Sequence, residues 1–423
     1  MRWDHLAHSR DTADDRTAQP AARPAAHPPA GAGTSGPGPG PAAVPGPVPV
    51  PAAAPAGGPA GGPGPGPAGG PAAGPPSAPP AAPSATRPPA GPPAALFGTA
   101  EVVTRTFDTP EFRGITFHEV RARSVVNRVP GASRMPFEWT VNPYRGCSHA
   151  CVYCFARKTH AYLDLDTGLG FDSQIVVKTN APEVLRRELG ARRWTGAHIA
   201  MGTNVDCYQR AEGRYRLMPG IIEALRDYAN PFSILTKGTL ILRDLPLLRQ
   251  AAEVTDVGVS VSVGFTDAGL WRTVEPGTPS PEARLAAVRT LTAHGIGVGV
   301  LMAPVIPFLG DSPEQLRRTV RSIAESGAES VTPLVLHLRP GAREWFMSWL
   351  AAHHPGLVRP YEQLYAGGAY APTWYQRRIT RQVHELAAEF GIGPARRGAA
   401  RRIAPPAPAP VREAAGPTQL TLL

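Results

Sequence analysis

Three of the four cysteines of this 423-residue chain lie within eight residues, as Cys147, Cys151 and Cys154. The C-x3-C-x2-C spacing can bring three soft thiolates to one metal centre. A [4Fe-4S] cluster normally takes four cysteines, so three leave one iron open. An open iron can bind the amino and carboxylate groups of a methionine. One electron passed into a sulfonium held there, as in S-adenosylmethionine (SAM), would break a C–S bond and form a 5′-deoxyadenosyl radical.

Two other interpretations of the three cysteines stay open at this point. The same thiolates, together with His149 or Cys207, could form a structural zinc site. Zinc usually prefers paired C-x2-C elements, and the chain has one such pair. Inert, buried cysteines fit poorly with the Ser and His residues and polar turns around the motif. The spacing therefore favours an iron–sulfur cluster.

The cysteine motif follows directly on a short β-rich run, and similar runs alternate with helical segments further along the chain. This alternation is typical of parallel strands joined by crossover helices. The predicted strands cover residues 138–142, 198–202, 232–236, 256–263, 297–303 and 330–337. They predict an α/β fold with a partial (β/α)6 barrel of the TIM type, because the remaining sequence is too helical to supply two more strands. In such barrels the chemistry gathers at the C-terminal ends of the strands.

Helix-boundary signals agree with this arrangement. Residues 312–315 (SPEQ) form a capping box with proline at the first helical position, and Gly327 is expected to end that helix. Ser280 and Pro281 predict the start of another helix that ends at Gly295. Pro219 predicts the start of a third helix.

The predicted strand at residues 256–263 alternates between valine and small residues. Its valines can face the outer helices while Gly258, Ser260 and Ser262 face the barrel interior. Small inward residues leave room for a ligand, although a tightly packed barrel centre also uses them.

A long low-complexity region precedes these elements. Within residues 41–70, 27 of 30 residues are Pro, Ala or Gly, and the same bias extends over residues 19–95. Because such a stretch has little apolar bulk to offset the entropy of ordering, we expect a disordered insertion. The expected organisation is an N-terminal segment (1–18), the insertion (19–95), a lead-in (96–136), the core barrel (137–340), a helical C-terminal region (341–395) and a flexible Arg/Pro-rich tail (396–423).

The formal net charge is +10, and only three of the 43 Lys and Arg residues are lysines. Codon usage accounts for part of this arginine excess. The arginines gather near the C-terminus, where they could bind phosphates or form a solvated helix face and tail. No apolar signal core or run of 18 apolar residues is present, so we expect a cytoplasmic protein without membrane association. The clustered arginines are Arg377, Arg378, Arg381, Arg396, Arg397, Arg401 and Arg402.

Residues 137–339 resemble the radical SAM superfamily and, within it, the spore photoproduct lyase and DNA-repair-photolyase-like branch. The resemblance rests on residues 142–155 around the cysteines, TNVDCYQ (203–209), ILTK (234–237), VSV (259–261), EPGTPSPEAR (275–284) and the Ala-Pro pair at 303–304. It implies a [4Fe-4S] cluster on the three cysteines and SAM as the molecule that this cluster cleaves.

The resemblance also implies roles for four further residues. Tyr153 matches the aromatic residue that packs beside the SAM adenine, and Lys237 matches a lysine that approaches the SAM carboxylate. Ser260 matches a SAM-contacting serine on the fourth strand. Asn204 falls where the family places another polar contact.

Two positions depart from the pattern of spore photoproduct lyase. Its hydrogen-donating cysteine after the second strand is matched by Gly202, which has no side chain. Its tyrosine after the third cluster cysteine is matched by Phe155, which lacks a hydroxyl. Cys207, five residues beyond Gly202, is a candidate to donate a hydrogen atom or relay a radical; the alternative is a small apolar filler.

We therefore expect a radical SAM enzyme whose first substrate hypothesis is nucleic acid, with DNA lesion repair as one form of it. A second hypothesis is radical modification of a protein or small metabolite. A third is a non-catalytic Fe–S or zinc protein that binds nucleic acid. An electron donor of the flavodoxin or ferredoxin type is the expected partner of the enzyme.

Overall fold

The computed structural model describes residues 102–130, 135 and 137–394. The expected N-terminal segment, the Pro/Ala/Gly insertion and the C-terminal tail lie outside the described residues. So do Arg396, Arg397, Arg401 and Arg402 of the predicted arginine cluster.

The main sheet confirms the expected partial barrel, and each of the six predicted strands appears within two residues of its predicted ends. Successive strands pair in parallel, and the order β12-β11-β10-β9-β8-β7-β4-β3 is linear, so the barrel is open between β3 and β12. Strand β3 is antiparallel to β4. The strands are β3 (Val126–Arg128), β4 (Trp139–Val141), β7 (Ile199–Met201), β8 (Phe232–Thr236), β9 (Val257–Ser262), β10 (Val298–Val305), β11 (Ser330–Val335) and β12 (Gly393–Pro394).

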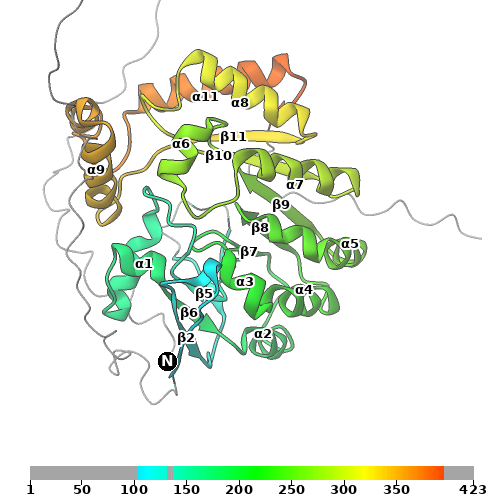
Figure 1. Ribbon diagram of the computed structural model, residues 1–423. Coiled ribbons are helices and arrows are strands. Elements are labelled where there is room, and N and C mark those ends of the chain that lie inside the picture. Colours follow the sequence, from blue (N-terminus) through cyan, green and yellow to red (C-terminus); the bar gives the residue numbers. More distant parts are fainter. Residues whose placement is uncertain (1–101, 131–134, 136, 395–423) are drawn as a thin grey trace, which may run out of the picture. The chain divides into compact units, whose positions relative to one another are not determined.

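Helices form a layer outside this sheet (Figure 1). They include α2 (Ala181–Leu189), α4 (Leu217–Asp227), α5 (Leu245–Val254), α7 (Pro281–Ala293), α8 (Pro313–Glu325) and α11 (Thr373–Glu389). The capping box is confirmed at the start of α8, where the Ser312 hydroxyl accepts a hydrogen bond from the amide of Gln315. Helix α7 starts after Ser280 as predicted. Helix α4 starts at Leu217, before Pro219, because proline is tolerated anywhere in a first helical turn.

A second sheet, which the sequence did not lead us to expect, flanks the cysteine motif. Its strands are β1 (Val102–Thr106), β2 (Thr116–Val120), β5 (Tyr144–Arg145) and β6 (Gln174–Lys178), in the order β1-β2-β6-β5. Strand β5 ends just before Gly146, so its pairing with β6 sets where the cysteine loop begins. The short elements η2 (Pro110–Phe112), η3 (Phe155–Leu163), α1 (Leu169–Ser173), α3 (Arg210–Tyr215), η4 (Thr239–Asp244) and α6 (Ala268–Val274) complete this part of the chain.

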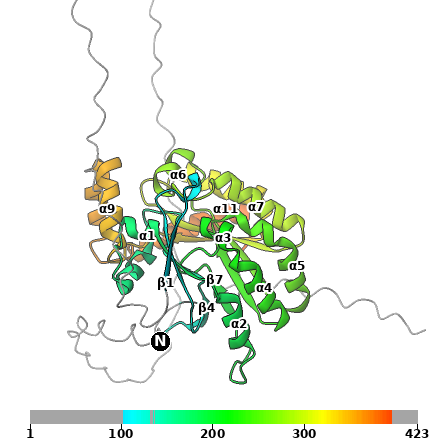
Figure 2. The same cartoon turned by 60° about the horizontal axis from the view of Figure 1, so that its bottom comes forward.

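The C-terminal region is helical, as expected. It contains α9 (Ala342–His353), η5 (Pro355–Leu357), α10 (Val358–Leu364) and α11. Figures 1 and 2 both show α9 on the side of the fold where α1 lies, and the ring of Trp345 on α9 stacks on the Arg157 guanidinium at 4.7 Å. Arg378 of α11 pairs with Asp311 of another segment, whereas Arg381 pairs with Glu385 on the exposed surface of the same helix. In the described part of the chain, no helix is both long and apolar enough to cross a membrane.

Strand β6 ends on a buried lysine, which generates a prediction about stability. Burial, and to a smaller extent the charge of Arg145, lower the pKa of Lys178 to about 7, while Glu188 opposes the shift. An unfolded lysine keeps its pKa of 10.5, so between pH 7 and 10.5 the unfolded chain binds more protons and stability rises with pH. We expect Lys178→Met to raise the free energy of unfolding by about 2–4 kcal/mol at pH 7.

The gain should shrink to under about 1 kcal/mol at pH 10, because that pH lies close to the pKa of the unfolded lysine and deprotonation on folding then costs little. Chemical denaturation at the two pH values measures it. Lys158→Met is the matched control, because Lys158 is an exposed lysine on η3. An equal gain at both pH values would contradict the buried-charge explanation.

Candidate functional site

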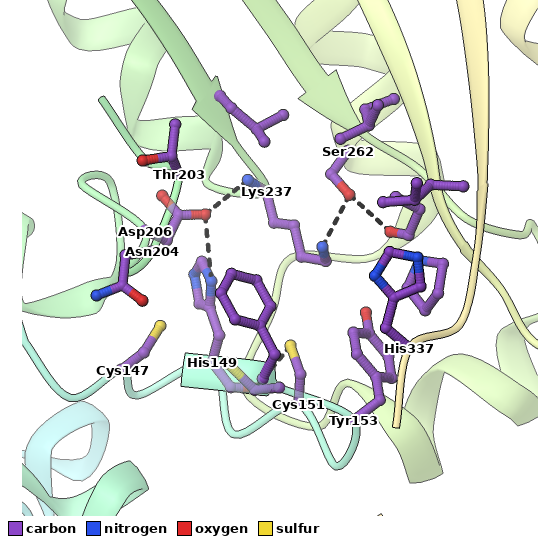
Figure 3. A pocket seen from close by; sticks show the side chains of 18 of the residues that line it. Cys147, His149, Cys151, Tyr153, Thr203, Asn204, Asp206, Lys237, Ser262 and His337 are labelled. Carbon is purple, nitrogen blue, oxygen red and sulfur yellow. Dashed lines mark hydrogen bonds and ion pairs between the residues drawn. The ribbon is translucent and has the colours of Figure 1, made fainter. Parts of the chain in front are cut away.

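A cavity lies at the C-terminal ends of the parallel strands, where the barrel fold places its active site. The loop of residues 146–154, here called the cluster loop, supplies one wall. The ends of β7 to β11 supply the others (Figure 3). The lining residues are Cys147, His149, Cys151, Tyr153, Cys154, Phe155, Gly202, Thr203, Asn204, Asp206, Leu235, Thr236, Lys237, Ser262, Leu301, Ala303, Pro304, Leu334, Val335, Leu336 and His337.

The three predicted cluster cysteines all line this cavity. Cys147 and Cys151 are buried and Cys154 is partly exposed, and none forms a disulfide. Burial raises the pKa of each thiol, and the charge of Asp206 raises that of Cys147 further. A metal or cluster bound here must therefore displace three protons as it binds, since thiolates are the ligands.

The donor set fits an iron–sulfur cluster better than a single zinc ion. Among the described residues, no three His, Cys, Asp or Glu side chains converge closely enough to hold one metal ion. Zinc needs about four ligands around one point. In a [4Fe-4S] cluster each thiolate binds a different iron, so the sulfur atoms need not meet at one point.

Gln209 holds the cluster loop on both sides of Cys147. Its buried side-chain amide donates to the carbonyl of Gly146 at 2.9 Å and accepts from the amide of Ser148 at 2.9 Å. The amide of Cys147 itself donates to the carbonyl of Phe171. These contacts satisfy backbone groups that the irregular loop cannot satisfy itself.

Arg157 satisfies a backbone carbonyl of the cluster loop at the second cysteine, Cys151. Its guanidinium is fully buried and donates to the carbonyl of Cys151 at 3.0 Å and to both carboxylate oxygens of Asp172 at 2.9 Å. It also lies against the rings of Phe171 and Trp345. A buried, permanently charged group of this kind persists only when its charge is paired, which Asp172 provides.

Residues 274–278, from the last residue of α6 into the connection before α7, run along the cluster loop. The carbonyl of Val274 accepts from the amide of Val152, and the amide of Gly277 donates to the carbonyl of His149, both at 3.0 Å. The two backbones approach so closely that a Cβ on Gly277 would lie 2.1 Å from the carbonyl oxygen of Ser148. Only glycine fits at this position.

Lys237, at the end of β8, is held from two directions. Its backbone amide donates to Asp206 at 2.7 Å, and Asp206 also lies 3.4 Å from His149 of the cluster loop. Its ammonium donates to the hydroxyl of Ser262 at 2.8 Å, which in turn donates to the carbonyl of Ala303 (Figure 3).

Glu275 lies behind these residues and is fully buried. It accepts hydrogen bonds from the Tyr153 hydroxyl and the Arg284 guanidinium, and its Oε1 lies 4.0 Å from the Lys237 ammonium. Burial alone would raise the pKa of Glu275, but the charges of Arg284 and Lys237 outweigh it and hold the pKa below its usual value. Glu275 is therefore an ionised carboxylate in the interior.

The structure brings most of the predicted SAM-binding residues together. Tyr153, Asn204 and Lys237 line the cavity with the cysteines, whereas Ser260 does not. Side chains alternate along a strand, so Ser262 faces the same way as Ser260 one step nearer the C-terminal end. Ser262 therefore lines the cavity on the strand face that it shares with Ser260, and the SAM contact expected of Ser260 stays a prediction.

The structure shows the surroundings of the two positions that differ from the spore photoproduct lyase pattern, and of Cys207. Gly202 has a φ of +74°, and a Cβ there would lie 1.8 Å from the carbonyl oxygen of Leu235, so no cysteine fits. Phe155 lines the cavity. Cys207 is 1% exposed and does not line the cavity. Its surroundings favour a packing role.

Sequence reasoning assigned no role to four residues that hold the loop and the lysine, namely Asp206, Gln209, Glu275 and Arg284. They lie in the TNVDCYQ and EPGTPSPEAR stretches. Those patterns marked the segments, but they did not say which side chains turn towards the cluster loop.

The close approach at Gly277 predicts the effect of one methyl group. Gly277→Ala must push the 274–278 segment off the cluster loop, which should cost about 1–3 kcal/mol of stability and sharply reduce iron uptake. Gly356→Ala is the control, because no heavy atom lies within 4 Å of a Cβ there. Thermal melting and iron per chain after anaerobic reconstitution measure both effects. Equal iron uptake by the two variants would show that the loop does not depend on this contact.

Comparison with known proteins agrees with the geometry. A model of the radical SAM superfamily matches residues 141–323. Uncharacterized proteins of Mycobacterium tuberculosis and Mycobacterium bovis are 50% identical over 320 residues, which is 76% of this chain and 92% of each relative. An uncharacterized protein of Methanocaldococcus jannaschii is 29% identical over 195 residues, which is 46% of this chain and 69% of that protein.

The fold is also similar to a solved structure. A mutant spore photoproduct lyase with bound AdoMet (SAM) and dinucleoside spore photoproduct aligns with a TM-score of 0.52 and 16% identity. The alignment covers 70% of this chain and 86% of that one. With its three cysteines on the loop after the first barrel strand, this chain belongs to the radical SAM superfamily and is a radical SAM enzyme.

Proposed function

We propose that Cys147, Cys151 and Cys154 hold a [4Fe-4S] cluster and that SAM binds beside it in the cavity. The observation that carries the proposal is that the three thiols line one cavity together with the ammonium of Lys237. With one electron from a flavodoxin- or ferredoxin-type donor, a cluster and SAM held here would supply methionine and a 5′-deoxyadenosyl radical able to take a hydrogen atom from a substrate.

The chain's own residues orient SAM in this proposal. The Lys237 ammonium binds the carboxylate of its methionine part, and Ser262 keeps that ammonium in place. The Tyr153 ring packs beside the adenine, and Asn204 supplies a further polar contact. The apolar walls formed by Leu235, Leu301 and Val335 limit the access of water to the radical.

Nucleic acid is the proposed substrate, supported by a group of side chains at the mouth of the cavity. This rim cluster consists of Phe155, His337, Arg339 and Tyr370. Phe155 and Tyr370 are 46% and 47% exposed, and the Arg339 guanidinium lies 5.8 Å and 5.9 Å from their ring centres. Exposed rings beside an arginine suit a stacked base and its phosphate. The similar solved structure binds a dinucleoside.

In this proposal, the hydrogen atom that quenches the product radical does not come from the positions that spore photoproduct lyase uses. Gly202 leaves no room for a thiol, and Phe155 has no hydroxyl. Cys207 is buried outside the cavity. We propose that the substrate radical is quenched by a group other than these three residues.

Anaerobic reconstitution tests the cluster and the role of each cysteine. The parent should bind about four iron atoms per chain and form 5′-deoxyadenosine from SAM after reduction with dithionite. Alanine at position 147, 151 or 154 should abolish both properties. Cys207→Ala is the matched control and should retain both, because its thiol lies outside the cavity.

Other results would select the alternatives. About one zinc per chain and no cluster would overturn the proposal in favour of a zinc protein. A stable cluster that never cleaves SAM would favour a binding module. A Cys207→Ala enzyme that forms 5′-deoxyadenosine but no product would identify Cys207 as the hydrogen donor.

Alanine substitution at the rim cluster tests the substrate. We expect Tyr370→Ala and Phe155→Ala to weaken binding of a fluorescent single-stranded oligonucleotide by about 1–3 kcal/mol each, the usual worth of one stacked base. Tyr228→Ala is the matched control. Tyr228 is also 46% exposed, but it follows α4 at the opposite end of the barrel. Unchanged anisotropy titrations in both rim variants would argue for a protein or metabolite substrate.

A further inference from the structure

The 274–278 segment contacts the cluster loop through its backbone and through one side chain between those contacts. The two backbone hydrogen bonds, from Val152 to Val274 and from Gly277 to His149, flank Cys151. Glu275 lies between them in the sequence, and its carboxylate reaches the hydroxyl of Tyr153. The segment therefore contacts the loop on both sides of the second cysteine.

Two partners of Glu275 line the cavity, although Glu275 itself does not. Tyr153 comes from the cluster loop and Lys237 from the end of β8, and both line the cavity. Both lie near the same carboxylate oxygen, Oε1. Glu275 can therefore act on a bound ligand through these two side chains.

The charges around Glu275 leave the lysine available to an anion. Arg284 is 1% exposed, pairs with the other oxygen, Oε2, and donates to the backbone carbonyl of Ser262 at 2.9 Å. One carboxylate thus faces two cations. Lys237 is the farther one, at 4.0 Å, and it is the one that reaches the cavity. At this distance Glu275 restrains the position of the Lys237 ammonium and leaves the ammonium able to pair with a bound anion.

We propose that Glu275 is a positioning residue that fixes Tyr153 and Lys237 in one geometry, so that the cluster loop and the lysine that binds the SAM carboxylate cannot move independently. This inference rests on the proposed function, because it concerns how SAM is held. A network of buried charged hydrogen bonds transmits such restraint, since each partner has no water with which to replace a lost contact.

Glu275→Gln tests the inference in the reconstituted protein. The glutamine keeps an acceptor for Tyr153 but removes the charge that restrains Lys237. We expect iron content close to that of the parent, because the cysteines and the backbone contacts remain. We expect the Kd for SAM to rise about tenfold and the change in the EPR spectrum of the reduced cluster on adding SAM to weaken.

The chain offers a matched control in a second buried Tyr–Glu–Arg group. Glu212 is fully buried and accepts hydrogen bonds from Tyr144 at 2.5 Å and Arg243 at 2.6 Å, and neither partner lines the cavity. Glu212→Gln should lower the melting temperature as Glu275→Gln does and leave the Kd for SAM unchanged.

Two further variants keep the test decisive. Tyr153→Phe removes the hydrogen bond from the other side and leaves the buried charges in place. Tyr153→Phe should also raise the Kd for SAM. In the double variant with Glu275→Gln, the Kd should rise by less than the product of the two single-variant fold-changes, because both residues act through the same network. If Glu275→Gln fails to take up iron, Tyr153→Phe becomes the deciding variant. A Kd for SAM in Tyr153→Phe equal to that of the parent protein would then overturn the inference.

The outcomes separate this inference from the proposed function. A parent that takes up no cluster or binds no SAM would end the proposed function and the inference with it. A parent that binds SAM, with Glu275→Gln giving the same Kd and the same EPR spectrum, would overturn the inference alone. Glu275 would then be a structural partner of Arg284.

Discussion

The site depends on the satisfaction of buried backbone groups in a loop that has no regular structure of its own. An irregular loop cannot pair its own amides and carbonyls, and burying them unpaired is costly. In the cluster loop these groups are paired by Gln209, by Arg157 and by the backbone of residues 274–278. The spacing of the three thiols is therefore maintained by segments that contain none of them.

The fold explains why those segments are available. Parallel strands bring all their C-terminal ends to one side, so the loops after β4, β7, β8 and β9 meet there. Asp206 and Glu275 each link the cluster loop to Lys237, one through the lysine's backbone amide and one near its ammonium. The second sheet sets the start of the loop through the pairing of β5 with β6. The cysteines and the lysine are thus parts of one connected polar network.

The same close packing restricts the chemistry. The backbone at Gly202 lies against the carbonyl of Leu235, which excludes a side chain at the position where spore photoproduct lyase has its donor cysteine. The departure is therefore built into the contact between the ends of β7 and β8, and a simple glycine-to-cysteine exchange would not restore the relative's chemistry. In the proposed function, the generation of a radical and its later use are therefore separate properties of the site.

The sequence by itself determined the six barrel strands, the capped helices and the three cysteines. Each of these depends on residues close together in the chain: apolar runs, a capping box and a C-x3-C-x2-C spacing. Only the tertiary structure decided that Ser262 rather than Ser260 lines the cavity, that Cys207 lies outside it, and that Glu275 meets Tyr153, 122 positions away. Such contacts depend on where strands end and how loops pack against each other, and neither periodicity nor local spacing records that information.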